Sequence, residues 1–390
     1  MQWLTDFLLD LVQTCLRMLP WPAEPRLIRM GHPGREAPVL VTCNYDLTVR
    51  RVLRALRGLD AYLLVAPTSG INVWCSAAGG HFTAHQVISI LRTSGVADLV
   101  DHRRLVLPQL SATGVERKLI EQRTGWHVVF GPVSAWDLPE YLATGQKTEG
   151  MRQVRFPFLD RLEMGVAWAF PISAVGGMVL AVGWGHLLLP FLAMTWGLSL
   201  ALYALFPWLP GKFERSVRKA PGWTRYLIFF DPAIRRNLVI WLLFVAGLCA
   251  YTYGQEVWNA KTLVGWSLAS LLVVLLISMD LAGSTPLYKS GLHEDRLLHI
   301  VLDEGVCRGR AMCWEVCPEN CYVIDPVRHK AVIALPDACV QCGACVVQCP
   351  EDALAFATPS GERIPPEVVR TYKLNLLGRR ANPAAPHAKV

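Results

Sequence analysis

Long apolar stretches without charge dominate the middle of the chain. Residues 164–211 contain no Asp, Glu, Lys or Arg, and residues 237–255 and 262–279 are also free of charge. A helix needs about 20 apolar residues to cross a bilayer, so the first stretch can hold two spans, separated at Gly183-Trp184-Gly185-His186. A buried soluble core is the alternative. The pattern predicts a four-helix transmembrane bundle within a membrane domain at 163–280, with spans at about 164–185, 186–209, 237–255 and 262–279.

Short apolar runs alternate with helical patterns in the preceding region, residues 37–162. Four runs are typical of buried strands, at 37–42, 61–66, 104–107 and 126–130. Helical spacing follows them at 48–57, 84–94, 114–123 and 135–143. This alternation predicts a Rossmann-like α/β domain with a parallel sheet, in which ligands bind beyond the carboxyl ends of the strands. The segments where we expect ligand contacts are 42–46, 67–82, 108–113 and 131–133.

The flanking segments have weaker patterns. In residues 1–36 we expect an amphipathic helix and a linker, because apolar residues between positions 3 and 19 follow helical spacing opposite Asp6, Asp10 and Arg17. The segment lacks the basic region and the small-residue cleavage site that are typical of a signal peptide. We therefore expect a helix at the membrane interface or one packed on the next domain. The remaining segments predict a linker at 281–299, a small domain at 300–360 and a tail at 361–390.

Composition and charge agree with a membrane protein. Hydrophobic residues make up 53% of the chain, charged residues 18%, and the mean hydropathy is +0.31, whereas soluble domains carry about 25% charged residues. Seven basic residues and two acidic ones lie in the loop at 212–236. By the positive-inside rule this loop and both soluble domains are cytoplasmic in a multi-pass protein of the cell (inner) membrane. The net charge of +7 forms no basic stripe with interleaved aromatics, so nucleic acid is not indicated.

Eight of the 12 cysteines lie between residues 307 and 349. Such clustering indicates a metal site in a reducing compartment rather than a set of disulfides. The spacing C-x2-C-x2-C-x3-C-P that begins at Cys339 is that of bacterial ferredoxins, in which three thiolates ligate one [4Fe-4S] cluster and the fourth crosses to its neighbour. Zinc is the alternative, but interleaved CxxCxxC spacing does not suit a tetrahedral ion. The region therefore predicts a small α+β dicluster ferredoxin domain of the bacterial type.

The upstream cysteine motif departs from this spacing at one position, because Arg310 stands where its second cysteine belongs. With the usual crossing, the intact second site comprises Cys317, Cys339, Cys342 and Cys345, and the first site comprises Cys307, Cys313 and Cys349. The first site could hold a [3Fe-4S] cluster, a [4Fe-4S] cluster with a non-cysteine ligand or with Cys321, or no cluster. Cys321 is otherwise explained as a small buried apolar residue.

Residues 72–79, Asn-Val-Trp-Cys-Ser-Ala-Ala-Gly, follow the second predicted strand and lead into a helix. Taken alone, a single cysteine here could be simple packing. The segment resembles the Asn-[Val/Ile]-Trp-Cys-Ala-[Ala/Gly]-Gly-Lys signature of HgcA, the corrinoid protein family of mercury methylation, which is related to the large subunit of the corrinoid iron–sulfur protein. The resemblance covers residues 37–290, and residues 300–355 are similar to the dicluster ferredoxin HgcB. The chain thus resembles a fusion of the two.

This resemblance implies a corrinoid (cobalamin) cofactor with Cys75 as the axial thiolate to cobalt, a soft donor that suits this metal. It implies that Asn72 and Trp74 shape the cap helix that carries Cys75. It also implies contacts with the corrin edge or its tail, with ordinary loop structure as the alternative, for Thr42, Asn44, Gln109 and Gly131. The implied activity is methyl transfer from the methylcorrinoid to Hg(II) or another soft acceptor, with the ferredoxin reducing the corrinoid. A folate-type methyl donor, a low-potential electron donor and the lipid bilayer would be its partners.

Two departures from the family pattern leave other functions open. Ser76, Ala78 and Gly79 replace the signature Ala, Gly and Lys, and the residues after Cys349 include no cysteine, whereas HgcB ends with a cysteine pair thought to hold Hg(II). One alternative is a corrinoid methyltransferase with a different acceptor. The other is a ferredoxin-type electron-transfer protein of the membrane, in which the α/β domain is a binding scaffold.

Overall fold

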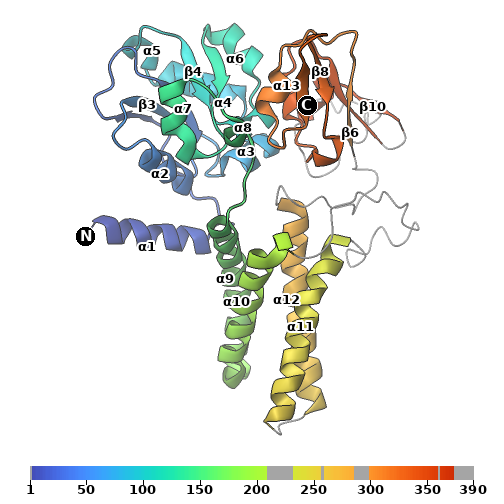
Figure 1. The fold of residues 1–390 in the computed structure, drawn as a ribbon. Coiled ribbons are helices and arrows are strands. Elements are labelled where there is room, and N and C mark those ends of the chain that lie inside the picture. Colours follow the sequence, from blue (N-terminus) through green and yellow to red (C-terminus); the bar gives the residue numbers. More distant parts are fainter. Residues whose placement is uncertain (1, 209–231, 256–258, 285–297, 359–360, 373–390) are drawn as a thin grey trace, which may run out of the picture. The chain divides into compact units, whose positions relative to one another are not determined.

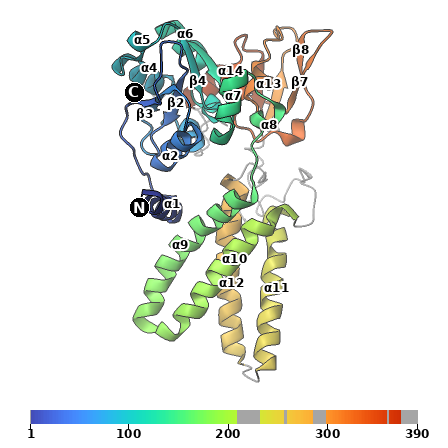
Figure 2. The same cartoon turned by 60° about the vertical axis from the view of Figure 1, so that its left-hand side comes forward.

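The computed structural model describes residues 2–208, 232–255, 259–284, 298–358 and 361–372, which Figures 1 and 2 show as ribbons. The chain divides into two compact units. One comprises residues 1–19 and 155–294, and the other comprises residues 20–154 and the chain from 295 onward. Each unit is therefore assembled from two separate stretches of sequence.

The first unit contains the apolar helices. In the described part of the chain, four helices are long and apolar enough to cross a membrane, which confirms the predicted number. They are α9 (Phe158–Gly183), α10 (Leu188–Leu205), α11 (Pro232–Gly254) and α12 (Ala260–Ser284). The turn η3 (Gly185–Leu187) separates α9 from α10, as the break in the sequence predicts, and η4 (Phe206–Trp208) follows α10. Most of the basic loop at 212–236 lies outside the described residues.

Small polar side chains pair inside the helix bundle. The Ser199 hydroxyl donates to the Gly165 carbonyl oxygen at 2.8 Å, and the Asn237 amide donates to the Ser278 hydroxyl oxygen at 2.8 Å. Large apolar side chains such as Leu189 and Leu243 point outward and are exposed. Interhelical hydrogen bonds inside an apolar exterior are typical of helices packed in lipid.

The N-terminal helix α1 (Gln2–Cys15) lies beside the start of α9 in the same unit (Figure 1). An ion pair between Arg17 Nη1 and Glu163 Oε2, at 3.2 Å, links the two segments. Exposed apolar side chains of α1 include Phe7, Leu8 and Leu11. The helix therefore contacts α9 and also has exposed apolar side chains.

The second unit begins with a five-stranded sheet of order β1-β3-β2-β4-β5. Its strands are β1 (Leu27–Met30), β2 (Val39–Cys43), β3 (Ala61–Ala66), β4 (Arg104–Leu107) and β5 (His127–Phe130). The last four are parallel, which confirms the predicted Rossmann-like sheet. β1 pairs antiparallel with β3, so the linker predicted after the helix in 1–36 contains a strand that was not predicted. Arg29 interrupts this short run, which therefore lacks a continuous apolar pattern.

Helices cover both faces of the sheet. Along β2, Val39 and Val41 point into one apolar cluster and Leu40 into the other, as expected for a strand buried on both sides. The helices of this domain are α2 (Asp46–Ala55), α3 (Val73–Gly79), α4 (Ala84–Thr93), α5 (Val96–Leu99), η1 (Gln109–Thr113), α6 (Arg117–Thr124), η2 (Ala135–Asp137), α7 (Leu138–Thr144) and α8 (Glu149–Arg152).

The unit ends with a small α+β domain, as predicted for a ferredoxin. Its elements are β6 (His299–Leu302), α13 (Met312–Val316), β7 (Tyr322–Asp325), β8 (Lys330–Ile333), η8 (Pro336–Ala338), α14 (Ala344–Gln348), β9 (Leu354–Ala357), β10 (Arg363–Ile364) and α15 (Pro366–Tyr372). Because β10 pairs with β9, and Ile364 and Val369 are buried in the domain core, the prediction of a tail from 361 onward is wrong up to residue 372. Residues 373–390 lie outside the described part.

Candidate functional site

Four predicted ligands of the second iron–sulfur site line one cavity of the ferredoxin domain. Cys317, Cys339, Cys342 and Cys345 surround a space of about 300 Å³ that includes open solvent. Within the described ranges, no three His, Cys, Asp or Glu side chains converge so as to hold a single metal ion. Four thiols around a cavity fit a multi-atom [4Fe-4S] cluster better than a zinc ion.

The three predicted ligands of the first site line a separate cavity of about 340 Å³. Cys307 and Cys313 from the upstream motif meet Cys349 from the downstream motif there, so the structure brings together the sets that the ferredoxin crossing predicts. Arg310 lies in the wall of this cavity. Its side chain is 67% exposed and its Nε lies 3.3 Å from Glu351 Oε1, so it offers no fourth thiolate. The donor set fits a cluster with three cysteine ligands.

Cys321 lines the second cavity rather than the first. Its backbone N–H donates to Cys317 Sγ at 3.3 Å. A hydrogen bond from the Cys321 thiol, aided by nearby backbone N–H groups, lowers the pKa of Cys317 to about 7. The structure therefore places the Cys321 thiol beside the second set of ligands, which does not favour the alternative in which the first site borrows it.

The cap helix α3 presents the Cys75 thiol at the carboxyl edge of the sheet. The Asn72 side-chain oxygen accepts a hydrogen bond from the Cys75 backbone N–H at 2.9 Å and caps the helix N-terminus. At the other end Gly80 adopts φ +83°, the left-handed conformation that favours glycine. Trp74 packs partly buried against the domain core, while Cys75 is exposed. An exposed thiol on a helix fixed at both ends fits the role of an axial ligand.

The cap helix rests closely on η1. A Cβ atom added to Gly114 would lie only 2.2 Å from the Ala77 carbonyl oxygen, so glycine is required for this approach. Ala77 itself is fully buried. The position of Cys75 is thus coupled to η1, which also contacts α13 and α14 of the ferredoxin domain.

The four other residues implied to contact the corrinoid are all buried: Thr42, Asn44, Gln109 and Gly131. The Asn44 side-chain oxygen accepts the backbone N–H groups of Thr68 at 2.8 Å and Gly70 at 2.9 Å, and its amide donates to the Ala23 carbonyl oxygen at 3.0 Å. These bonds tie two loops to the end of β2. Asn44 is 5% exposed, so the structure supports the loop-structure alternative for it.

The other three residues are also buried: Thr42, Gln109 and Gly131. Thr42 is a buried residue of β2. The backbone N–H of Gly131 donates to the Leu107 carbonyl oxygen at 2.7 Å, and an added Cβ would lie 2.9 Å from a methyl group of Val106. Gln109 is 1% exposed, and its amide donates to the Arg152 carbonyl oxygen at 2.8 Å. This burial favours the ordinary-loop alternative for these residues, and their implied corrin contacts stay a prediction.

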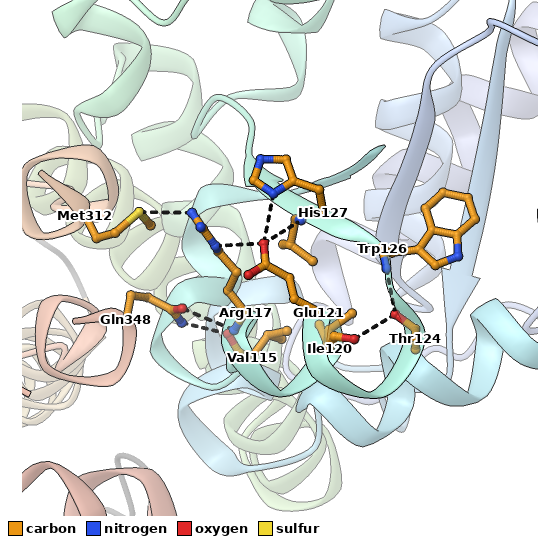
Figure 3. Close-up of polar contacts among 10 residues, drawn as sticks. Val115, Arg117, Ile120, Glu121, Thr124, Trp126, His127, Met312 and Gln348 are labelled. Carbon is orange, nitrogen blue, oxygen red and sulfur yellow. Dashed lines mark hydrogen bonds and ion pairs between the residues drawn. The ribbon is translucent and has the colours of Figure 1, made fainter. Parts of the chain in front are cut away.

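Gln348 on α14 joins the ferredoxin domain to the α/β domain (Figure 3). Its side-chain amide donates to the carbonyl oxygens of Ala112 and Val115, both at 2.7 Å, and its oxygen accepts the Arg117 backbone N–H at 3.2 Å. The Arg117 side chain contacts Met312 Sδ at 3.2 Å. One buried glutamine thus satisfies three backbone groups on the other domain.

A second set of contacts lies beside the Cys317 ligand. The Arg152 guanidinium donates to the Trp314 carbonyl oxygen at 2.9 Å and lies 3.6 Å from the centroid of the Trp314 ring. Lys147 Nζ donates to the Glu315 carbonyl oxygen at 3.2 Å, and burial lowers the pKa of Lys147 to about 8. Sequence reasoning missed these residues because an isolated Lys, Arg or Gln carries no spacing signal.

The two domains also share an apolar core. Met312, Val316, Cys342 and Ala344 of the ferredoxin domain are buried in the same cluster as the sheet residues. Trp74 of the cap helix and Val340, which lies between two ligands of the second site, pack against this cluster. The second iron–sulfur site and the cap helix are therefore parts of one packed unit.

Comparisons with known proteins agree with this two-part organisation. Residues 14–142 match the family of the CO dehydrogenase/acetyl-CoA synthase delta subunit, and residues 332–355 match the 4Fe-4S binding domain family. The gamma subunit of the acetyl-CoA decarbonylase/synthase complex of Methanopyrus kandleri is 39% identical over 125 residues, 32% of this chain and 27% of that protein. The corresponding subunit of Archaeoglobus fulgidus is 37% identical over 125 residues, 32% of this chain and 26% of that protein.

A third relative is the corrinoid/iron–sulfur protein large subunit of Moorella thermoacetica, which is 29% identical over 119 residues, 30% of this chain and 26% of that protein. The chain spans about a quarter of the length of these relatives. The N-terminal part of the chain is thus similar to the corrinoid iron–sulfur proteins, and the part after the four apolar helices matches the 4Fe-4S binding domain family.

Proposed function

We propose that the protein is a membrane-bound corrinoid-dependent methyltransferase that methylates Hg(II), with its fused ferredoxin reducing the corrinoid. The observation that carries the proposal is the exposed Cys75 thiol on the capped helix α3. This helix contacts η1, which also contacts α13 and α14 of the ferredoxin domain. When bound, the corrinoid would supply the cobalt that carries the methyl group. Cys75 would provide the thiolate ligand to that cobalt, and the chain keeps the predicted ligands of the second iron–sulfur site in the same packed unit.

The contacts between the two soluble domains support a reductase role for the ferredoxin. A buried hydrogen bond of Gln348 and partly buried hydrogen bonds of Lys147 and Arg152 join them, and an apolar core runs across the boundary. A donor that is already docked needs no diffusional encounter before each electron transfer. A folate-type methyl donor and an external low-potential reductant complete the proposed reaction.

Metal analysis of the full-length protein, purified anaerobically in detergent and supplied with cobalamin, tests the corrinoid assignment. We expect about one cobalt per chain and a thiolate-ligated spectrum that is lost in Cys75→Ala. Cys75→His should retain partial cobalt binding, because imidazole is also a cobalt ligand. Cys249→Ala, which removes a cysteine from α11, serves as the matched control and should bind cobalt normally. A protein that holds iron but never cobalt would instead be a membrane electron-transfer protein.

The acceptor is tested separately on cobalt-loaded, methylated protein. Addition of Hg(II) should give methylmercury in the wild type and none in Cys75→Ala. The loaded protein could instead keep its methyl group in the presence of Hg(II) and release it to another thiophilic acceptor. That result would replace Hg(II) by the other acceptor and leave the assignment as a methyltransferase intact.

A further inference from the structure

The hydroxyl group of Tyr322 contacts a ligand of the second iron–sulfur site. Tyr322 begins β7, is 3% exposed and lines the second cavity. Its Oη donates to Cys345 Sγ at 3.1 Å. Within the part of the chain that the structure describes, this is the one hydrogen bond that the hydroxyl group makes. The phenol ring is packed in the ferredoxin core.

The chemistry of this contact favours a ligating sulfur as the partner. A buried tyrosine hydroxyl needs a hydrogen-bond acceptor, because leaving it without one is unfavourable. A neutral thiol is a weak acceptor, whereas hydrogen bonds to an ionised group are shorter and stronger. The Tyr322 hydroxyl is therefore best satisfied when Cys345 is a thiolate bound to iron.

We propose that Tyr322 raises the reduction potential of the second iron–sulfur site through its O–H···S bond to Cys345. Reduction adds one electron from an external reductant to the cluster, and Tyr322 keeps its proton. The added negative charge is shared with the ligand sulfurs, so the hydrogen bond is stronger in the reduced state and stabilises it. Hydrogen bonds to the sulfurs are among the factors that set cluster potentials. The inference rests on the proposed function only in requiring that this site holds a cluster.

The first cavity offers no equivalent contact. Among the described residues that line it, none carries a hydroxyl group. The hydrogen bond of Tyr322 therefore acts on the second site only.

A redox titration followed by low-temperature electron paramagnetic resonance tests the proposal on full-length, anaerobically purified protein. Tyr322→Phe removes the hydroxyl and keeps the ring. We expect unchanged iron content and a more negative midpoint potential for the second site. At the wild-type midpoint potential the ratio of reduced to oxidised cluster should be about tenfold lower, which corresponds to about 59 mV for a one-electron couple. Tyr372→Phe, at the end of α15 in the same domain, should leave the midpoint unchanged.

An unchanged midpoint in Tyr322→Phe with full iron content would overturn the proposal and leave the cluster assignment intact. Wild-type protein that never holds a cluster at this site would instead count against the proposed function. If Tyr322→Phe loses the cluster, 3-fluorotyrosine placed at position 322 decides the matter, because it keeps the ring and has a more acidic hydroxyl. Its stronger hydrogen bond should shift the midpoint to a more positive value, and no shift would refute the role of the bond.

Discussion

Arg310 makes the two cysteine-lined cavities of the ferredoxin domain chemically unequal. It leaves the first cavity with three thiols and places a guanidinium in its wall. This group stays charged at any relevant pH, so it favours the more reduced, more negative state of a nearby cluster. We therefore expect the first site to be missing, incomplete or higher in potential, and the second site to be the competent electron donor to the corrinoid.

Replacing the arginine tests this directly. Arg310→Cys supplies the missing thiolate at the position that the ferredoxin spacing requires, so we expect a second low-potential [4Fe-4S] signal and a higher iron content per chain. Iron analysis and low-temperature electron paramagnetic resonance measure both.

The neighbouring Arg308 provides the control, because it lines the same cavity outside the ligand positions of the motif. Arg308→Cys should leave iron content and signals as in the wild type. Two ordinary low-potential [4Fe-4S] signals in the wild type would contradict the assignment of Arg310. If Arg310→Cys changes neither iron content nor spectrum, the alignment of the first motif is wrong.

At the residue scale, sequence could predict ligands that belong to a spaced motif and could not predict burial. The cysteine spacing correctly anticipates that Cys349 lies with Cys307 and that Cys317 lies with Cys339. The positions of Asn44 and Gln109 at strand ends suggest ligand contact, yet their side chains are used to join loops and domains. Which polar group at a strand end faces the ligand depends on neighbouring segments that the local pattern does not contain.

At the scale of elements, segments with a strong apolar pattern could be predicted, and short segments without one could not. β3 and β4 occupy the residues expected for them, 61–66 and 104–107, and the four apolar helices are present. β1, η1 and β10 have five residues or fewer and form through contacts with distant segments. Tertiary contacts of this kind override weak local preference.

Gln348 is the contact through which α14 docks on η1, and its truncation tests the importance of this interface. Gln348→Ala removes three hydrogen bonds and leaves two buried carbonyl groups without their partner, which weakens docking by about 1–3 kcal/mol. We expect faster amide hydrogen exchange in η1 and α14, slower reduction of the bound corrinoid by the ferredoxin, and unchanged iron content.

Gln146→Ala is the matched control, because this glutamine is exposed after α7. It should exchange and transfer electrons as the wild type does. Unchanged exchange in Gln348→Ala would show that the shared apolar core alone holds the two domains together.

At the scale of the whole molecule, the proposed reaction requires both soluble domains on one side of the membrane. In the topology that we propose, four crossings put the segments before α9 and after α12 on the same side. The basic residues at 212–236 favour the cytoplasmic side for both. The single packed unit formed by residues 20–154 and the chain from 295 onward is compatible only with an even number of crossings between them.

Reporter fusions in cells test this topology. Fusions after residue 150, within 215–230 and after residue 300 should report the cytoplasm, and fusions near 185 and 258 should report the outside. The outer positions serve as controls for each other, because both lie in short connections between helices. One soluble domain found outside would contradict both the topology and the reduction of the corrinoid by the ferredoxin.

The shared core imposes an order on biosynthesis. The α/β domain, which supplies the first part of this core, ends at residue 154. The ferredoxin residues that complete the core emerge from the ribosome only after the apolar helices; they are Met312, Val316, Cys342 and Ala344. At about 5–20 residues per second the delay is roughly 10–40 s. During that interval the growing chain exposes an apolar surface that only the last domain covers, so the rate at which residues 155–344 are synthesised sets the minimum time for which the nascent protein is open to aggregation and proteolysis.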